Sequence, residues 1–183
     1  MTSTPTSSSR SSTALRTDAS RSERSLIVVG LDGSEPARAA LQFAAEEATF
    51  RGASLRVVSV WRVDSIGLES SYVPLSDYVP IGELLEEAKE LADDTVAHAR
   101  EELGRHWPAL EFETKTIEGG PPGDTLVDES KGATLLVVGN RGRGSLGSLL
   151  LGSVSEHVVR NAHCPVVVIP HGWIPSSEPP AAA

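Results

Sequence analysis

Five short runs of apolar, mostly β-branched residues recur along the chain, and longer segments of helical period separate them. The runs lie at residues 26–31, 55–61, 112–117, 134–138 and 166–169. Several of them are apolar at successive positions, which is typical of parallel strands that are covered on both faces. The alternation therefore predicts an α/β fold: a single doubly wound, Rossmann-like, five-stranded parallel sheet with helices on both faces.

Four segments between these runs are predicted to be helical, at residues 34–52, 83–103, 124–130 and 153–162. Ser34 is the expected N-cap of the first, with Glu35 and Pro36 in its first turn, and Gly52 ends it. The third follows a Pro121-Pro122-Gly123 turn. The second is expected to bury one stripe of residues, namely Leu84, Ala88, Leu91, Thr95, Ala99 and Leu103.

The ends of the chain differ in composition from its middle. Residues 1–24 are mostly Ser, Thr, Arg and Ala, with too few large apolar side chains to offset the entropy of ordering, so we expect a disordered tail. The Arg- and Ser-rich composition also resembles an organellar transit peptide, although amphipathic patterning is weak. Residues 25–170 are predicted to form a single domain and residues 171–183 a carboxy-terminal tail.

Charge and cysteine content exclude several classes of protein. The formal net charge of −9 disfavours a protein that wraps a phosphate backbone, so we expect no nucleic-acid partner. Cys164 is the only cysteine, which excludes a disulfide within the chain and suggests a reducing, cytoplasmic location. No apolar run approaches the roughly 20 residues that span a bilayer, so no membrane association is expected.

The glycine-rich segment 137–155 fits two different nucleotide-binding patterns. Gly142, Gly144 and Gly147 spell the dinucleotide fingerprint G-x-G-x-x-G. That fingerprint should open the first βαβ unit and precede an acidic residue by about 20 positions. Here it follows the fourth strand, and no acidic residue occurs between Glu156 and Glu178. The dinucleotide interpretation is rejected, and the chain also lacks a Walker-type phosphate loop.

The second pattern is wider: Gly139, two residues, Gly142, nine residues, and then Gly152-Ser153. It places two glycines just past a strand end and a Gly-Ser pair at the start of a helix. The free N–H groups and the dipole of a helix N-terminus favour anions, and the Ser153 and Ser155 hydroxyls are expected to donate to phosphate oxygens. The segment therefore predicts a polyphosphate site.

In a doubly wound sheet the ligand lies beyond the carboxyl ends of the strands, where the strand order reverses. Asp32, Trp61 and the loop after Val138 are predicted to lie there. Asp32-Gly33-Ser34 also fits a plain turn and helix cap. The long connection from Arg62 to Gly82 has two interpretations, a cover over the ligand or a surface insertion.

The glycine spacing, the opening IVVGLDGS, the second strand VVSVW and the closing HCPVVVIP together resemble the universal stress protein family, in its ATP-binding branch. The resemblance covers roughly residues 24–170. It implies that Asp32 lies near the ribose and phosphates and helps to hold Mg²⁺, that Gly30 and Leu31 pass along the nucleoside, and that the Val60 backbone recognises adenine.

The resemblance also implies a phosphate loop and helix cap at Gly139, Gly142, Gly152 and Ser153, with Val154 and Ser155 following in register. Asn140, Arg141 and Arg143 lie in the same loop and are predicted to line the site, although the two arginines depart from the family pattern. For Arg141 and Arg143 two roles stay open, a fork on the phosphates or solvation on the loop. The family further implies a homodimer paired through the last strand, residues 166–169.

Three functions are compatible with these residues. The first is an ATP-binding protein of the stress response, in which the nucleotide is a conformational or regulatory ligand. The second is a slow Mg²⁺-dependent ATP hydrolase or phosphotransferase that uses Asp32, although no base or catalytic residue is identified. The third is a nucleotide-free dimeric interaction module. Cys164 and the histidines are interpreted as structural or surface residues.

Overall fold

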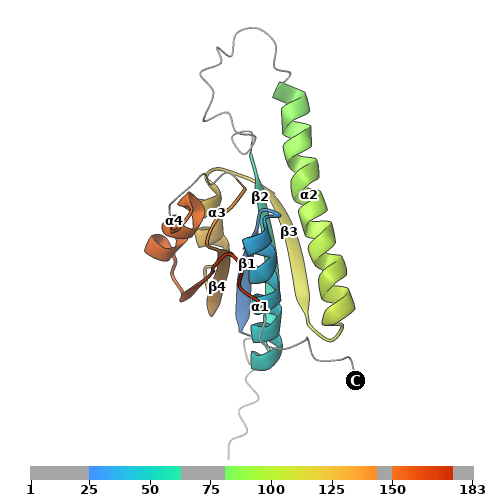
Figure 1. The fold of residues 1–183 in the computed structure, drawn as a ribbon, viewed down its shortest axis with the longest axis vertical. Helices are drawn as coiled ribbons and strands as arrows, with labels where there is room; N and C mark the ends of the chain where they lie inside the picture. The colour runs from blue at the N-terminus through green and yellow to red at the C-terminus, as the bar shows by residue number, and fades with distance from the viewer. Residues whose placement is uncertain (1–24, 63–80, 144–149, 175–183) are drawn as a thin grey trace, which may run out of the picture.

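The computed structural model describes residues 25–62, 81–143 and 150–174 of the chain. Its elements are β1 (Leu26–Leu31), α1 (Glu35–Arg51), β2 (Ser54–Trp61), α2 (Ile81–His106), β3 (Phe112–Glu118), α3 (Pro122–Glu129), β4 (Leu135–Gly139), α4 (Ser153–Asn161) and β5 (Val166–Ile169). All neighbouring strands are parallel, in the order β3-β2-β1-β4-β5. The predicted fold class is confirmed (Figure 1).

Helix α1 begins and ends at the residues that the sequence indicates. The Ser34 hydroxyl accepts a hydrogen bond from the N–H of Ala37 at 3.3 Å, and a proline follows in the first turn. Gly52 ends the helix with φ 62°, and its N–H bonds back to the carbonyls of Ala48 and Thr49. The buried face is rich in alanine, which lets the helix axis approach the sheet closely.

The buried face of helix α2 differs in part from the predicted stripe. The buried residues are Ala88, Ala92, Val96, Ala99 and Leu103, whereas Leu91 is 46% exposed and Thr95 is only half-buried. The buried stripe thus keeps Ala88, Ala99 and Leu103 of the predicted set and adds Ala92 and Val96. Leu91 and Thr95 consequently lie on a flank of the helix and not on its buried face.

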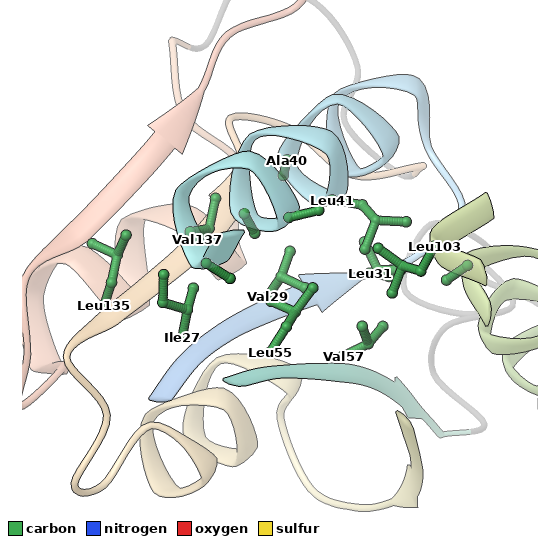
Figure 2. Packing of buried hydrophobic residues seen from close by; sticks show 14 of the residues in the cluster. Ile27, Val29, Leu31, Ala40, Leu41, Leu55, Val57, Leu103, Leu135 and Val137 are labelled. Atoms are coloured by element: carbon green, nitrogen blue, oxygen red, sulfur yellow. The ribbon is translucent and has the colours of Figure 1, made fainter. Parts of the chain in front are cut away.

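Two apolar clusters lie on opposite faces of the sheet. One joins the sheet to α1 and α2, and Figure 2 shows Ile27, Val29, Leu55 and Val137 packed beneath Ala40 and Leu41. The other joins the opposite face to α3 and α4, through residues such as Val28, Leu126 and Val158. Each central strand therefore buries side chains on both faces, as expected for a doubly wound sheet.

The first residues of the expected carboxy-terminal tail contact the domain. The ring of Trp173 meets that of Phe43 edge to face, with centroids 5.9 Å apart. His171 Nδ1 lies 2.6 Å from Glu35 Oε2 at the start of α1. The packed region thus extends past residue 170. Helix α3 also begins earlier than predicted, because Pro122 and Gly123 form its first turn.

Candidate functional site

The strand order reverses between β1 and β4, at the centre of the sheet. Strands β2 and β3 follow β1 on one side, and β4 and β5 lie on the other. The carboxyl ends of β1 and β4 therefore bring together the turn after Leu31 and the loop after Gly139. This is where an open α/β sheet binds its ligands.

Asp32 ties these two segments together. Its Oδ1 accepts a hydrogen bond from the N–H of Ser34 at 3.0 Å, and its Oδ2 accepts one from the N–H of Arg143 at 3.1 Å. The Ser34 hydroxyl also donates to the carbonyl of Arg141, at 3.4 Å. Ser34, which caps α1, and Asp32 thus both hold the loop after β4 in place.

The three glycines of the wide pattern have different neighbours. A Cβ at Gly139 would lie 2.8 Å from the Pro36 carbonyl carbon, so this glycine lets β4 approach the backbone of α1. A Cβ at Gly142 would clash with Asp32 Oδ2. A Cβ at Gly152 would lie no closer than 3.4 Å to any atom of the described residues. Packing within the protein therefore accounts for Gly139 and Gly142, but not for Gly152.

The N-terminus of α4 has no side-chain cap. The carbonyl of Asn140 accepts hydrogen bonds from the N–H of Gly152 at 2.7 Å and from the hydroxyl of Ser155 at 2.9 Å. The first intrahelical bond runs from the N–H of Glu156 to the carbonyl of Gly152. The N–H groups of Ser153, Val154 and Ser155 precede it, so they are available to an anion.

The sequence predicts the same role for the hydroxyls of Ser153 and Ser155, but the two residues differ in exposure and in their hydrogen-bond partners. Ser153 is exposed at the first position of α4. Ser155 is 2% exposed, and its hydroxyl points to the carbonyls of Asn140 and Gly152. The hydroxyl of Ser155 therefore holds the loop against the helix, and its contact with a phosphate stays a prediction.

The loop after β4 is also anchored on its other side. The N–H of Asn140 donates to the carbonyl of Ile169 at 2.7 Å, which extends the pairing of β4 with β5. The Asn140 side-chain oxygen is buried and has no hydrogen-bond partner among the described residues. An acceptor of this kind is a group that a ligand or a water can satisfy.

Helix α2 contributes a third segment, which the sequence did not predict. Gly33 has φ 77°, and a Cβ there would clash with Arg143 Nη2 and lie 3.0 Å from Thr95 Oγ1. Arg143 therefore crosses the turn after Asp32 toward α2. No local pattern signals this contact, because Gly33, Thr95 and Arg143 lie far apart in the sequence.

The positions predicted to contact the nucleoside lie at the ends of β1 and β2. The register of β1 with β2 ends at Leu31 and Ser59, whereas β2 continues to Trp61. Trp61 turns its carbonyl toward β3, where it accepts from the N–H of Gly119 at 3.3 Å. Since backbone direction alternates along a strand, the peptide groups of Val60 face the side of β1. The register pairs the Val60 N–H with the carbonyl of Leu31, so it is the Val60 carbonyl that lies past the last paired residue of β1.

Gly30 and Leu31 are packed in the interior. A Cβ at Gly30 would lie 2.7 Å from the Cδ1 atom of Leu126, and Leu31 is 8% exposed. Both residues thus serve the packing of β1 against helices on either face. Their contact with a nucleoside stays a prediction.

Other polar residues have structural partners. His157 on α4 lies 2.7 Å from the Asp124 carboxylate, and its ring fills the space that a side chain at Gly123 would need. Burial raises the pKa of the Cys164 thiol, although a hydrogen bond with Ser130 opposes this shift. No group of three or more metal-binding side chains occurs in the described residues. No helix there is long and apolar enough to cross a bilayer.

A family model described as the universal stress protein family matches residues 24–170. The chain is 32% identical over 151 residues to a universal stress protein of Mycolicibacterium smegmatis, covering 82% of this chain and 47% of that protein. It is 37% identical over 149 residues to one of Mycobacterium tuberculosis, covering 78% and 46%. The chain thus spans about half the length of these curated relatives.

Solved structures show the same fold. A universal stress protein family member from Burkholderia pseudomallei is 27% identical, with a TM-score of 0.59 over 81% of this chain and 98% of that one. Neighbouring universal stress protein structures include a complex with cAMP and, from Archaeoglobus fulgidus, a complex with dAMP. Their TM-scores of 0.48 are too low to compare site geometry with this chain.

Proposed function

Because the chain belongs to the universal stress protein family, we propose that it binds ATP between the carboxyl ends of β1 and β4, as a regulatory ligand in a stress response. One observation carries the proposal: an uncapped helix N-terminus and a glycine loop converge on Asp32 at the reversal of strand order. These are the elements that bind a polyphosphate in an α/β sheet.

The phosphates would lie against α4. The N–H groups of its first turn and the exposed Ser153 hydroxyl supply donors there, and Arg141 and Arg143 supply positive charge on the loop beside it. The glycine at position 152 leaves room for a phosphate to approach the backbone, because no atom of the residues that the structure describes lies closer than 3.4 Å to the position of a Cβ there.

The nucleoside would lie over the ends of β1 and β2. The carbonyl of Val60 faces this space, and a backbone C=O can accept a hydrogen bond from the amino group at the edge of an adenine ring. A ligand that spans from Val60 to Ser153 must cross Asp32, which joins the two loops. Binding would therefore change how these loops are held, as a regulatory ligand requires.

A magnesium ion fits this arrangement with Asp32 as its protein ligand. Magnesium commonly uses one or two carboxylates, phosphate oxygens and water, so one exposed carboxylate beside a polyphosphate is sufficient. Asp32 would hold the metal against the phosphates, and the metal would neutralise part of their charge.

We also propose a homodimer paired through β5, in a cytoplasmic setting. Strand β5 is at the edge of the sheet, and Val166, Val167 and Val168 are each only partly buried. An apolar edge strand of this kind is a natural pairing surface. The cytoplasmic location remains a prediction from the single cysteine, Cys164.

ATP binding is tested by thermal unfolding with and without ATP and Mg²⁺. At an ATP concentration about 100 times the Kd, we expect the Tm to rise by about 5–10 °C. Ser153→Glu should abolish this rise, because the carboxylate would occupy and repel the phosphate position. The substitution should not harm folding, since a negative charge is favourable in the first turn of a helix.

Two controls separate these effects. Ser153→Ala removes only the hydroxyl and should weaken ATP binding less than Ser153→Glu does. Asn161→Asp adds the same charge at the far end of α4 and should leave the ATP-dependent rise in place. The proposal fails if the parent protein gains no Tm with ATP, or if Ser153→Glu still gains the full rise.

A further inference from the structure

Helix α2 turns one of its flanks toward α1 and β1. On that flank Glu102 accepts a hydrogen bond from Gln42 of α1 at 2.9 Å. The opposite flank faces β3, where Arg100 donates to the hydroxyl of Thr114 at 2.5 Å. These two contacts fix the rotation of α2 about its own axis.

Thr95 lies on the same flank as Glu102, two turns nearer the N-terminus of α2. Its Oγ1 is 3.0 Å from the Cβ position of Gly33, and the guanidinium of Arg143 reaches the same point. Thr95 therefore marks the level along α2 at which the helix meets the candidate site.

Leu91 is one turn further along this flank. The Thr95 hydroxyl donates to the carbonyl of Leu91 at 2.8 Å, so the two residues follow each other on the helix surface. Helix α1 begins only at Glu35, so it does not extend beside Leu91. Leu91 is accordingly 46% exposed, whereas Ala88 and Ala92 on the buried face are each 6% exposed.

Leu91 lies at the same end of the sheet as the candidate site, where the strands have their carboxyl ends. Helix α2 runs antiparallel to the strands, and Figure 1 shows its N-terminal part extending past the sheet where the strands end. Val60 and Trp61 project past the end of β1 on the same side. A nucleotide with its phosphates at α4 would place its nucleoside between these residues and the Leu91 flank.

We infer that Leu91 supplies an apolar wall for the nucleoside of the bound nucleotide, and that the Thr95 contact with Gly33 and Arg143 positions that wall. The inference rests on the proposed function, which assigns the phosphates to α4. A purine ring needs apolar surface on its face as well as hydrogen bonds at its edge. Leu91 offers that surface, and the carbonyl of Val60 offers a hydrogen bond at the edge of the ring.

The test compares Leu91→Ala with the parent protein by titration calorimetry, using ATP, adenosine and tripolyphosphate as probes. We expect ATP and adenosine to bind about 5- to 10-fold more weakly to the variant, because part of a leucine side chain no longer becomes buried. Tripolyphosphate should bind equally to both proteins, since it carries no nucleoside. Leu91→Met should restore most of the ATP affinity.

Phe50→Ala is the matched control. Phe50 is 88% exposed near the end of α1, at the amino ends of the strands and thus at the opposite end of the sheet from the candidate site, and its removal should change no affinity. The inference is wrong if Leu91→Ala binds ATP as the parent does, or if tripolyphosphate weakens in parallel with ATP. A parent protein that binds neither ATP nor adenosine would overturn the proposed function and this inference with it.

Discussion

At the scale of single residues, the glycines of the loop after β4 differ in what an added methyl group would meet. At position 139 it would meet the backbone of Pro36 and Ala37 within 3 Å, and backbone cannot rotate away as a side chain can. At position 152 it would make only ordinary contacts. One sequence pattern therefore contains both a packing requirement and an open position.

We expect Gly139→Ala to lower the free energy of unfolding by about 1–3 kcal/mol, because the methyl group forces β4 and α1 apart. Gly152→Ala should change the free energy of unfolding by less than about 0.5 kcal/mol while weakening ATP binding. Urea denaturation and ATP titration of both variants check this. Equal losses of stability in the two variants would show that Gly152 is also needed for packing.

At the scale of elements, α1 depends on Ser34, which caps the helix and also contacts the loop after β4. Its hydroxyl accepts from the N–H of Ala37 and donates to the carbonyl of Arg141. The cap was predicted from sequence because capping is local, within three residues. The contact with Arg141 joins positions 107 residues apart, and no local pattern encodes it.

Ser34→Ala should cost about 1 kcal/mol of folding free energy, because one N–H at the start of α1 loses its acceptor. Ser34→Asp should keep most of this stability, since Asp is an equally good N-cap. Urea denaturation of the three proteins checks both values. If Ser34→Asp were as unstable as Ser34→Ala, the contact with Arg141 would contribute more to the free energy of unfolding than the cap does.

For helix α2 the sequence predicts the element but not all of its buried residues. The periodicity predicts an amphipathic helix with Leu91 and Thr95 on the buried face, whereas both residues lie beside that face. Two overlapping apolar stripes share Ala88, Ala99 and Leu103, and the folded chain buries the one that also contains Ala92 and Val96. That choice depends on what packs against the helix, which the helix sequence does not contain.

At the scale of the whole molecule, the proposed dimer depends on which backbone groups of β5 face outward. The carbonyls of Pro165 and Ile169 accept from Leu136 and Asn140, so alternate residues face β4. The peptide groups of Val166 and Val168 therefore face the free edge of the sheet.

Val168→Pro removes an outward N–H and should give a folded monomer, because an edge strand tolerates proline on its free side. Val167→Pro removes an N–H that faces β4 and should instead destabilise the fold. Light scattering coupled to size-exclusion chromatography measures the mass, and circular dichroism checks folding. A folded Val168→Pro variant that remains a dimer would place the interface elsewhere.

The sequence by itself determined the strands, the helices and their order, together with the cap of α1. Each of these depends on residues a few positions apart. Only the tertiary structure decided that Asp32 holds Arg143, that the Ser155 hydroxyl turns inward, and that α2 brings Thr95 to Gly33. Asp32 and Arg143 are 111 residues apart, and such contacts depend on how strands and helices pack. Local periodicity specifies which face of an element is apolar, whereas the neighbours of each side chain follow from the assembled sheet.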